Sequence, residues 1–477
     1  MSSSVRSVRS SSLGPAPSGE DLSCPLKTMF MQDSGDEVQR AYLGDMAKLA
    51  GKYDFKLVIQ MPSYGTAQEL ALDLCTRTGL SLAQLRNVAA AIDSKDAFSA
   101  WGEDNKIITN PDARTGDMDV LVPPMIDHHV LAWAQGYTKD EGFHAYSSDF
   151  QGAVSGRDEG EIARRFALSL GQPVFTTRSY LEGGNVLPGT GRDGKPCALV
   201  GRDSVIVTAF HLMASDGLDR TQWAHRAKTL RTSIDEVTLA RVQDKLTWAE
   251  QQATPEDAVK FLAAIEMSKE TIASDLRIPY ANLTMLTQAE FHIDMCTRPL
   301  RPDQVMLNHP AEAWALLNAM LEPGATRLKV WERTELEEMQ SKAFEEIQTS
   351  GPVYDTIKAE LEAAGKTVLL APGIFASSTR QNNFMNGVPG TDGRGETFYF
   401  VNGSSILPLQ KAVGKFLKEK AHIDHVEFVA REGGGSATLS AGEISVSWSG
   451  AMDCREVHTS ALYRGPNLFE LLPGGSA

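Results

Sequence analysis

Residues 398–408 read FYFVNGSSILP, an aromatic and β-branched run that ends at an Asn-Gly pair. A run of this kind, bounded by turn-forming residues, is typical of a short β-strand. Runs of the same character recur along the chain: KLVIQM at 56–61, DVLV at 119–122, PVFT at 173–176, SVIVTAF at 204–210, KTVLL at 366–370 and EISVSW at 443–448. Because helical patterns separate several of these runs, the sequence predicts an α/β or α+β fold.

Two longer stretches are predicted to be helical. The first covers 254–275, where Thr254 can cap the helix and Pro255 suits its opening turn. The second covers 311–349 and is divided by Pro323-Gly324, a pair that interrupts a helix. Both stretches are expected to be excursions from a strand-rich core.

The domain organisation follows from composition. Residues 1–25 begin with MSSSVRSVRSSSLGPAPSG, a Ser/Arg-rich stretch that is predicted to be a disordered tail because it cannot bury enough apolar surface. An export or organelle-import segment shares this composition and remains an alternative. Residues 26–477 contain no Pro/Ser-rich linker, so they are predicted to form a single domain with helical insertions near 211–280 and 310–365.

The cysteines and the hydropathy suggest a cytoplasmic protein. Five cysteines are scattered, odd in number and without a C-x-x-C pair, which favours a reducing compartment over a disulfide framework or a zinc site. No run of eighteen apolar residues is present, so no membrane-spanning helix and no membrane partner are expected.

The net charge excludes one class of partner. A formal charge of −15 argues against nucleic-acid binding, because phosphate backbones require a basic footprint. An acidic surface suits a cationic small molecule or peptide, although its usual role is to keep a protein soluble.

Two motifs that suggest cofactors are given structural interpretations. The glycines at 189, 191 and 194 match G-x-G-x-x-G, but a strand-like run follows instead of a helix, so a hairpin loop is predicted. Asp127-His128-His129 has no accompanying ligands at metal-binding spacing, and adjacent side chains point in different directions. No metal site is therefore expected there.

Four other segments carry polar side chains in restricted surroundings. WGEDN at 101–105 places a carboxylate in a turn, and LEGGN at 181–185 places another where glycines allow close approach of a ligand or another backbone. FHID at 291–294 sets His and Asp two residues apart, so both would face one side of a strand. SGAMDC at 449–454 delivers a cysteine after small residues. Each segment alone also has an ordinary structural explanation.

In this order, the four segments resemble those of the guanidine-modifying enzyme superfamily. WGEDN is similar to the W-x-x-D segment of agmatine and peptidylarginine deiminases, LEGGN to E-G-G-[DNS], and FHID to H-[LVI]-D. The segment at 398–408 closely resembles the F-Y-x-x-N-G-x-x-x-x-P stretch of agmatine deiminases. Agmatine deiminases usually carry His before the nucleophile, where this chain has Asp453. A second H-x-D string begins at His422, but it follows the Asn-Gly segment, so His292 is preferred.

The resemblance implies a fold and a set of site residues. The fold would be the pentein fold, an α/β propeller of five ββαβ-like units with helical insertions, and residues 26–477 would be its catalytic domain. Cys454 would be the nucleophile, His292 the general acid and base, and Glu182 its partner. Asp104 and Asp294 would bind the substrate. No metal and no organic cofactor is implied.

The same resemblance implies an activity with two alternatives. The expected protein is a deiminase that converts agmatine, arginine or a peptidyl-arginine to the ureido product and ammonia through a covalent thiouronium intermediate. The partner would be a small cationic guanidino substrate or an arginine side chain. An amidinotransferase, in which an amine accepts the amidino group, is the first alternative. A non-catalytic binding or effector protein on the same scaffold is the second.

Overall fold

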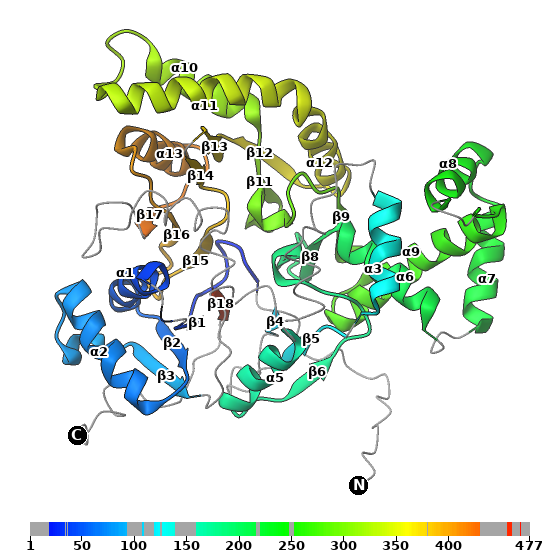
Figure 1. Ribbon diagram of the computed structural model, residues 1–477, viewed down its shortest axis with the longest axis horizontal. Coiled ribbons are helices and arrows are strands. Elements are labelled where there is room, and N and C mark those ends of the chain that lie inside the picture. The colour runs from blue at the N-terminus through cyan, green and yellow to red at the C-terminus, as the bar shows by residue number, and fades with distance from the viewer. Residues whose placement is uncertain are drawn as a thin grey trace.

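The computed structural model shows a mixed α/β protein in which small sheets alternate with helices (Figure 1). It describes residues 19–33, 35, 37–92, 107–108, 119–124, 126–138, 159–215, 220–247, 252–378, 380–429, 456–459 and 468. Within these residues no helix is long and apolar enough to cross a membrane. The α/β class predicted from the sequence is confirmed.

Five of the sheets share one strand pattern, in which an antiparallel pair is extended by a parallel strand. The first sheet has the order β18 (Glu456–Thr459), β1 (Thr28–Gln32), β2 (Lys56–Met61), β3 (Val88–Ile92). The others are β4 (Ile107–Ile108), β5 (Val120–Val122), β6 (Val174–Thr176); β7 (Val186–Thr190), β8 (Pro196–Gly201), β9 (Leu283–Leu286); β10 (Thr297–Arg301), β11 (Gln304–Asn308), β12 (Thr367–Ala371); and β15 (Val388–Thr391), β16 (Thr397–Asn402), β17 (His425–Val429). A two-stranded sheet, β13 (Ile374–Ala376) with β14 (Gln381–Asn383), lies between the fourth and fifth.

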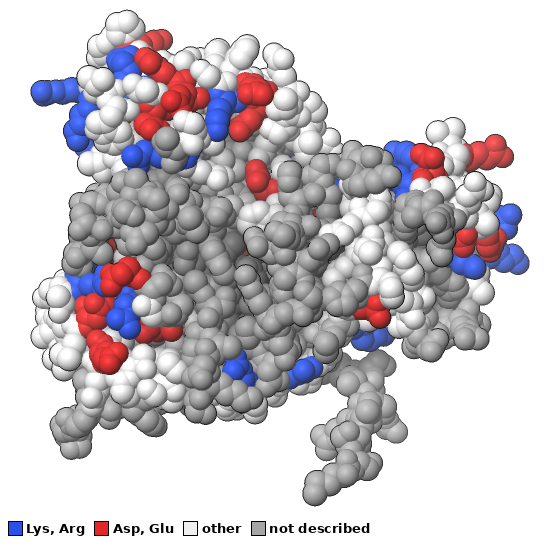
Figure 2. All heavy atoms as spheres, in the orientation of Figure 1, with Lys and Arg blue, Asp and Glu red and all other residues white. Residues whose placement is uncertain are grey.

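Helices connect the parallel strands of each sheet, as parallel pairing requires. They are α1 (Glu37–Tyr53) and α2 (Tyr64–Thr78) in the first unit; α3 (His128–Thr138) and α5 (Glu159–Ser169) in the second; α6 (Arg202–Ala214), α7 (Arg220–Arg231), α8 (Glu236–Leu246) and α9 (Pro255–Asp275) in the third; α10 (Pro310–Leu321), α11 (Val330–Thr349) and α12 (Gly351–Ala363) in the fourth; and α13 (Leu407–Glu419) in the fifth. On the face in Figure 2, acidic and basic side chains are interspersed over the outer helices.

Neighbouring sheets contact one another in chain order. Strand β18 contacts β4, and β7 contacts β10, so the first strands of these units face each other. The second and third units are joined by an ion pair between Asp119 Oδ2 and Arg277 Nη1, 2.6 Å apart. In Figure 1 the five sheets follow one another around the middle of the molecule.

The fifth unit contacts both the fourth and the first. Met306 of β11 and Tyr399 of β16 lie in one apolar cluster. On the other side, the Tyr42 hydroxyl of α1 donates to Asn402 Oδ1 at 2.5 Å, at the end of β16. Each unit therefore contacts the next one, and the last contacts the first.

The local predictions succeed where capping and turn residues are explicit. Helix α9 begins at Pro255, with Thr254 and Asp257 forming a reciprocal capping box. The G-x-G-x-x-G glycines lie in the β7–β8 hairpin, where Gly191 N donates to Lys195 O at 2.7 Å. The predicted hairpin loop is confirmed, and α10 and α11 end and begin on either side of Pro323-Gly324 as expected.

Three local predictions were wrong. SVIVTAF at 204–210 is the middle of helix α6, because Gly201 caps a helix whose residues are buried almost all round. His292 and Asp294 do not lie on a strand, since residues Ile293–Met295 form a short 3₁₀ turn. Residues 19–25, which the predicted tail included, are ordered: Glu20 pairs with the buried Arg298 at 3.4 Å, and Asp21 is fully buried.

Candidate active site

The first component of the site is the Glu182 carboxylate, which is held by the turn that follows it. Glu182 is extended and precedes the 3₁₀ turn Gly183–Asn185, which leads into β7. Asn185 Nδ2 donates to Glu182 Oε2 at 3.2 Å. Glu182 is only 9% exposed, so its carboxylate faces into the protein.

The Glu182 carboxylate meets the ring of His292. His292 Nε2 lies 3.1 Å from Glu182 Oε1, and the histidine is 3% exposed. A Cβ atom built on Gly184 would lie 2.4 Å from His292 Nδ1, so only glycine leaves space for the ring at this position. The space that the glycines leave is therefore filled by a histidine side chain, and not by a ligand or another backbone as expected.

A network of amides fixes the loop that carries His292. Ile293 N donates to Asn185 Oδ1 at 3.3 Å, and Gln288 Nε2 donates to Phe291 O at 2.9 Å. The Phe291 ring covers the His292 ring with centroids 4.5 Å apart. Since buried amides that satisfy each other restrict side-chain motion, the imidazole has a defined orientation.

Asp294 lies in the same buried turn as His292. It is fully buried, and its Oδ2 accepts a hydrogen bond of 2.5 Å from Asn386 Nδ2. Asn386 lies in the loop before β15, which is tied back by Asn383 Nδ2 donating to Met295 O at 2.9 Å. A hydrogen bond to a carboxylate is charge-assisted and orients it strongly.

Sequence reasoning missed Asp203, a third carboxyl group near the pair. Asp203 lies in the first turn of α6 and is 2% exposed. Burial raises its pKa well above the ordinary value; Arg202 and His292 lower that pKa, whereas Glu182 raises it. The Gly-Arg-Asp-Ser sequence after a strand is a helix-start signal that could have drawn attention to this residue.

Asn386 was also missed, and its partner lies 92 residues away in the sequence. The predicted residues Asp104 and Cys454, together with Asp453, lie outside the described residues. Among the predicted residues that are described, the structure brings Glu182 and His292 into direct contact and places Asp294 in the same turn as His292.

The competing H-x-D string has a different environment. His422 and Asp424 are exposed. Asp424 Oδ2 accepts from Thr397 N at 2.8 Å and from Thr397 Oγ1 at 2.7 Å, so it holds the start of β16. This environment agrees with the preference for His292.

The described cysteines are poorly suited to nucleophilic attack on a ligand at His292. Cys296 is fully buried, its Sγ lies 3.7 Å from Ile293 O, and burial raises the pKa of its thiol. Burial also raises the thiol pKa of Cys75 and Cys197, and that of Cys24 to about 12. A raised thiol pKa disfavours the thiolate, which is the reactive form.

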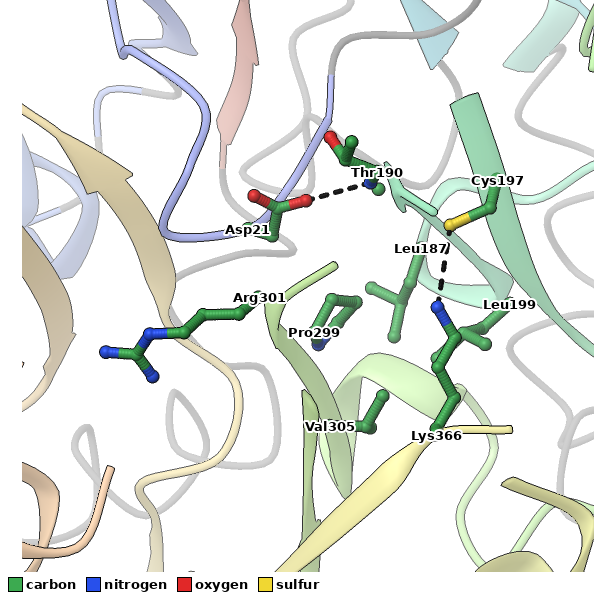
Figure 3. Close-up of a pocket in the computed structure, with 10 residues that line it drawn as sticks. Asp21, Leu187, Thr190, Cys197, Leu199, Pro299, Arg301, Val305 and Lys366 are labelled. Carbon is green, nitrogen blue, oxygen red and sulfur yellow. Dashed lines mark hydrogen bonds between the residues drawn. The ribbon is translucent and has the colours of Figure 1, made fainter. Parts of the chain in front are cut away.

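Cys197 faces a small cavity of its own (Figure 3). Its Sγ accepts from Lys366 Nζ at 3.8 Å, and Asp21 lies on the opposite wall, accepting from Thr190 N at 2.9 Å. The cavity lining includes neither Glu182 nor His292, so this hollow is separate from the candidate active site.

The arrangement concentrates carboxyl groups around a single buried imidazole. In the part of the chain that the structure describes, no three His, Cys, Asp or Glu side chains form a group that could hold a metal ion. An imidazole oriented by a carboxylate can accept and return a proton. Buried carboxylates favour a cation as the ligand, because an opposite charge offsets their desolvation.

The chain is similar to solved structures of agmatine deiminase from Campylobacter jejuni. One alignment covers 95% of this chain and 97% of the other at 10% identity, with a TM-score of 0.45. Another, to a cysteine-to-serine variant with substrate bound, covers 96% and 99% at 9% identity, with the same TM-score. No protein-family model matches the chain, and no curated protein matches it by sequence. A TM-score below 0.5 does not establish a shared fold.

Proposed function

We propose that this protein is a cysteine-dependent deiminase that converts a guanidino substrate to its ureido product and ammonia. The observation that carries the proposal is the buried Glu182–His292 pair, 3.1 Å apart, with Asp294 buried two residues further on. These are the acid–base partners and the substrate carboxylate that the sequence motifs predict.

We propose further that the five sheets form a closed propeller with the pentein arrangement. The repeated strand pattern and the cyclic order of contacts between neighbouring sheets support this. In such a ring, the loops that carry Glu182, His292 and Cys454 would converge on the central axis. One catalytic domain would then contain the complete site.

Substrate binding would rest on carboxylates. A guanidinium group is planar and carries a fork of N–H donors, which a carboxylate can accept in bidentate fashion. Asp294, oriented by Asn386, would be one acceptor, and Asp104 would be the other. The two would fix the plane of the cation and leave one face open to attack.

The reaction would proceed in two halves. The Cys454 thiolate attacks the central carbon, and the bond to one nitrogen breaks as His292 donates a proton to the departing ammonia, leaving a thiouronium bound to sulfur. His292 then takes a proton from water, whose oxygen attacks the same carbon. The C–S bond breaks, and the ureido product leaves. Glu182 would stabilise the imidazolium in both halves.

The carboxylates also bear on the charge of the nucleophile. A thiolate beside carboxylates is disfavoured, whereas a bound cation favours it. Ionisation of Cys454 would therefore depend on the substrate. The free enzyme would hold the thiol in its neutral form.

A colorimetric ureido assay tests the function. Agmatine, free arginine, methylated arginines and an arginine-containing peptide are each incubated with the wild type, with Cys454→Ala and with Cys75→Ala as the matched control. We expect ureido product from at least one substrate with the wild type and Cys75→Ala, and none with Cys454→Ala.

Two outcomes separate the alternatives. Product that appears only when an amine is added identifies an amidinotransferase. If no guanidine is turned over and Cys454→Ala behaves as the wild type in every assay, the protein is not a guanidine-modifying enzyme. A binding role on the same scaffold is then the remaining alternative.

A further inference from the structure

Three segments that are far apart in the sequence meet at the start of helix α6. A Cβ atom built on Gly201 would lie 2.6 Å from both Asn185 Oδ1 and Gln288 Oε1. Asn185 belongs to the turn that holds Glu182, and Gln288 belongs to the loop that leads to His292. The start of α6 is thus packed against the two side chains that hold the segments of Glu182 and His292.

Asp203 is hydrogen-bonded directly to Gln288, one of these contacting side chains. Its backbone N–H donates to Gln288 Oε1 at 2.8 Å, and Gln288 in turn holds the carbonyl of Phe291, the residue before His292. Among the described residues, neither carboxyl oxygen of Asp203 accepts a hydrogen bond of ordinary geometry, although the residue is only 2% exposed. The side-chain amide of Gln288 is close enough to lower the pKa of the carboxyl, but less than burial raises it. A buried carboxyl group with so few donors is costly.

Three charged or titratable side chains act on Asp203 within the part of the chain that the structure describes. Arg202 Nε lies 3.8 Å from Asp203 Oδ1, and the other two are Glu182 and His292. The amide of Gln288 is the neutral neighbour. The first turn of α6 adds the positive end of the helix dipole, which favours a negative charge.

We propose that Asp203 is a positioning residue that forms one electrostatic unit with Glu182 and His292 and stabilises the protonated ring of His292. The proposal rests on the proposed function only in its use of His292 as the acid and base. The identity of the guanidino substrate does not affect the proposal, since Asp203 acts through the histidine.

The coupling follows from like and unlike charges. Two carboxylates near each other in a buried site do not both ionise readily while His292 is neutral, and burial together with Glu182 raises the pKa of Asp203 accordingly. When His292 gains a proton, the new positive charge favours ionisation of Asp203. The protonated ring then faces two negative charges instead of one.

The test is the titration of His292, followed by NMR of the wild type labelled in its histidine rings, with His292→Gln used to assign the signal. Asp203→Asn keeps the size of the side chain and removes its ability to ionise. We expect the titration midpoint of His292 to fall by about one pH unit, the effect of losing one nearby charge in a partly screened site.

Asp275→Asn is the matched control. Asp275 is a partly buried carboxyl of the same unit, but it accepts hydrogen bonds from Ser179 N and Oγ at 2.8 and 2.6 Å. Its replacement should loosen the chain before Glu182 without moving the His292 midpoint. The wild type and both variants are compared by thermal unfolding to confirm that they fold.

Two results would overturn the inference: an unchanged midpoint in Asp203→Asn, or an equal shift in both variants. Asp203→Glu provides a further check, since it restores the charge and should bring the midpoint back toward the wild-type value. The NMR titration needs no substrate. A deiminase assay that fails while the midpoint shifts would therefore refute the proposed function and leave the coupling intact.

Discussion

Asn386 Nδ2 lies 2.5 Å from Asp294 Oδ2, so the amide of one unit fixes the carboxylate of another. Asp294 is fully buried in the turn after His292, and Asn386 precedes strand β15. The orientation of the proposed substrate carboxylate is therefore determined by contact between two sheets.

Replacing Asn386 by Ala should weaken substrate binding. Losing a hydrogen bond to a charged group costs about 1.5–3 kcal/mol, which corresponds to a fall in kcat/KM of about 10- to 100-fold, mostly through KM. Steady-state kinetics measure the change in KM and in kcat/KM. Asn382→Ala is the control, because among the described residues neither polar atom of the buried Asn382 side chain has a hydrogen-bond partner. An Asn386→Ala variant with wild-type KM would contradict the proposed role.

Replacing Glu182 by Gln should reduce turnover with little change in KM. The substitution keeps the shape of the side chain but removes the charge that stabilises the His292 imidazolium at 3.1 Å, and acid–base catalysis of this kind contributes about 10²- to 10⁴-fold. The measurement is kcat across pH. Glu338→Gln, on the solvent side of α11, serves as the control. Equal kcat in Glu182→Gln and the wild type would exclude the pair from catalysis.

Replacing Gly184 by Ala should displace the His292 ring. The added methyl group would lie 2.4 Å from Nδ1, closer than a Cβ can be, so the ring or the turn must move. We expect kcat to fall by about 100-fold, since small misplacements of a catalytic group have effects of this size. Gly51→Ala is the matched control, because it lies in α1 with no atom within 4 Å, and the exchange should stabilise the helix by about 0.5–1 kcal/mol. Undiminished activity in Gly184→Ala would show that the close packing of Gly184 against the His292 ring is not required for catalysis.

Stability should decrease as the pH rises toward neutrality, because of Glu290. Burial raises the pKa of this carboxyl from 4.5 to about 7, even though the Tyr354 hydroxyl donates to it at 3.2 Å. Between these pH values the folded chain keeps a proton that the unfolded chain has lost. The free energy of unfolding should thus fall by about 3 kcal/mol from pH 4.5 to 7 through this group.

Thermal unfolding across this pH range measures the effect of Glu290. Glu290→Gln should make the dependence flatter than in the wild type. Glu338→Gln should leave the slope in place, because hydrogen bonds from Ser378 lower the pKa of Glu338 instead. A slope that persists unchanged in Glu290→Gln would assign the proton to another group.

Alkylation of Cys454 should be slow in the free enzyme and become faster only above pH about 8, where an ordinary thiol ionises. Iodoacetamide labelling, with the modified cysteine located by mass spectrometry, follows it. A bound guanidinium should increase ionisation of the thiol at neutral pH. Small guanidinium analogues of the substrate, added before iodoacetamide, should therefore make alkylation at neutral pH faster. Rapid alkylation at pH 6 without a ligand would refute substrate-dependent ionisation.

Local sequence signals predicted the turns and capped helices well and the buried elements less well. Thr254 and Pro255 mark the start of α9 because their effects depend only on neighbouring residues. Residues 204–210 offered no such pattern: a helix that is buried almost all round has no polar face, so its apolar run looks like a buried strand.

In the candidate site, too, local signals were informative and tertiary contacts could not be predicted. The glycines beside Glu182 signalled a close approach, but which side chain fills the space at Gly184 depends on a loop more than a hundred residues away. Asn386 and Asp203 contribute through tertiary contacts that no local pattern specifies. The family resemblance implied the pairing of Glu182 with His292, and only the fold reveals the residues that orient them.

The pairing of β18 with β1 has a consequence for biosynthesis. Strand β1 can pair with β2 early, but its antiparallel neighbour is not available until Thr459 has left the ribosome. Cys454 lies two residues before that strand in the sequence. A nascent chain that already holds Glu182, His292 and Asp294 would thus remain without its proposed nucleophile, and a partly made copy would lack the proposed activity.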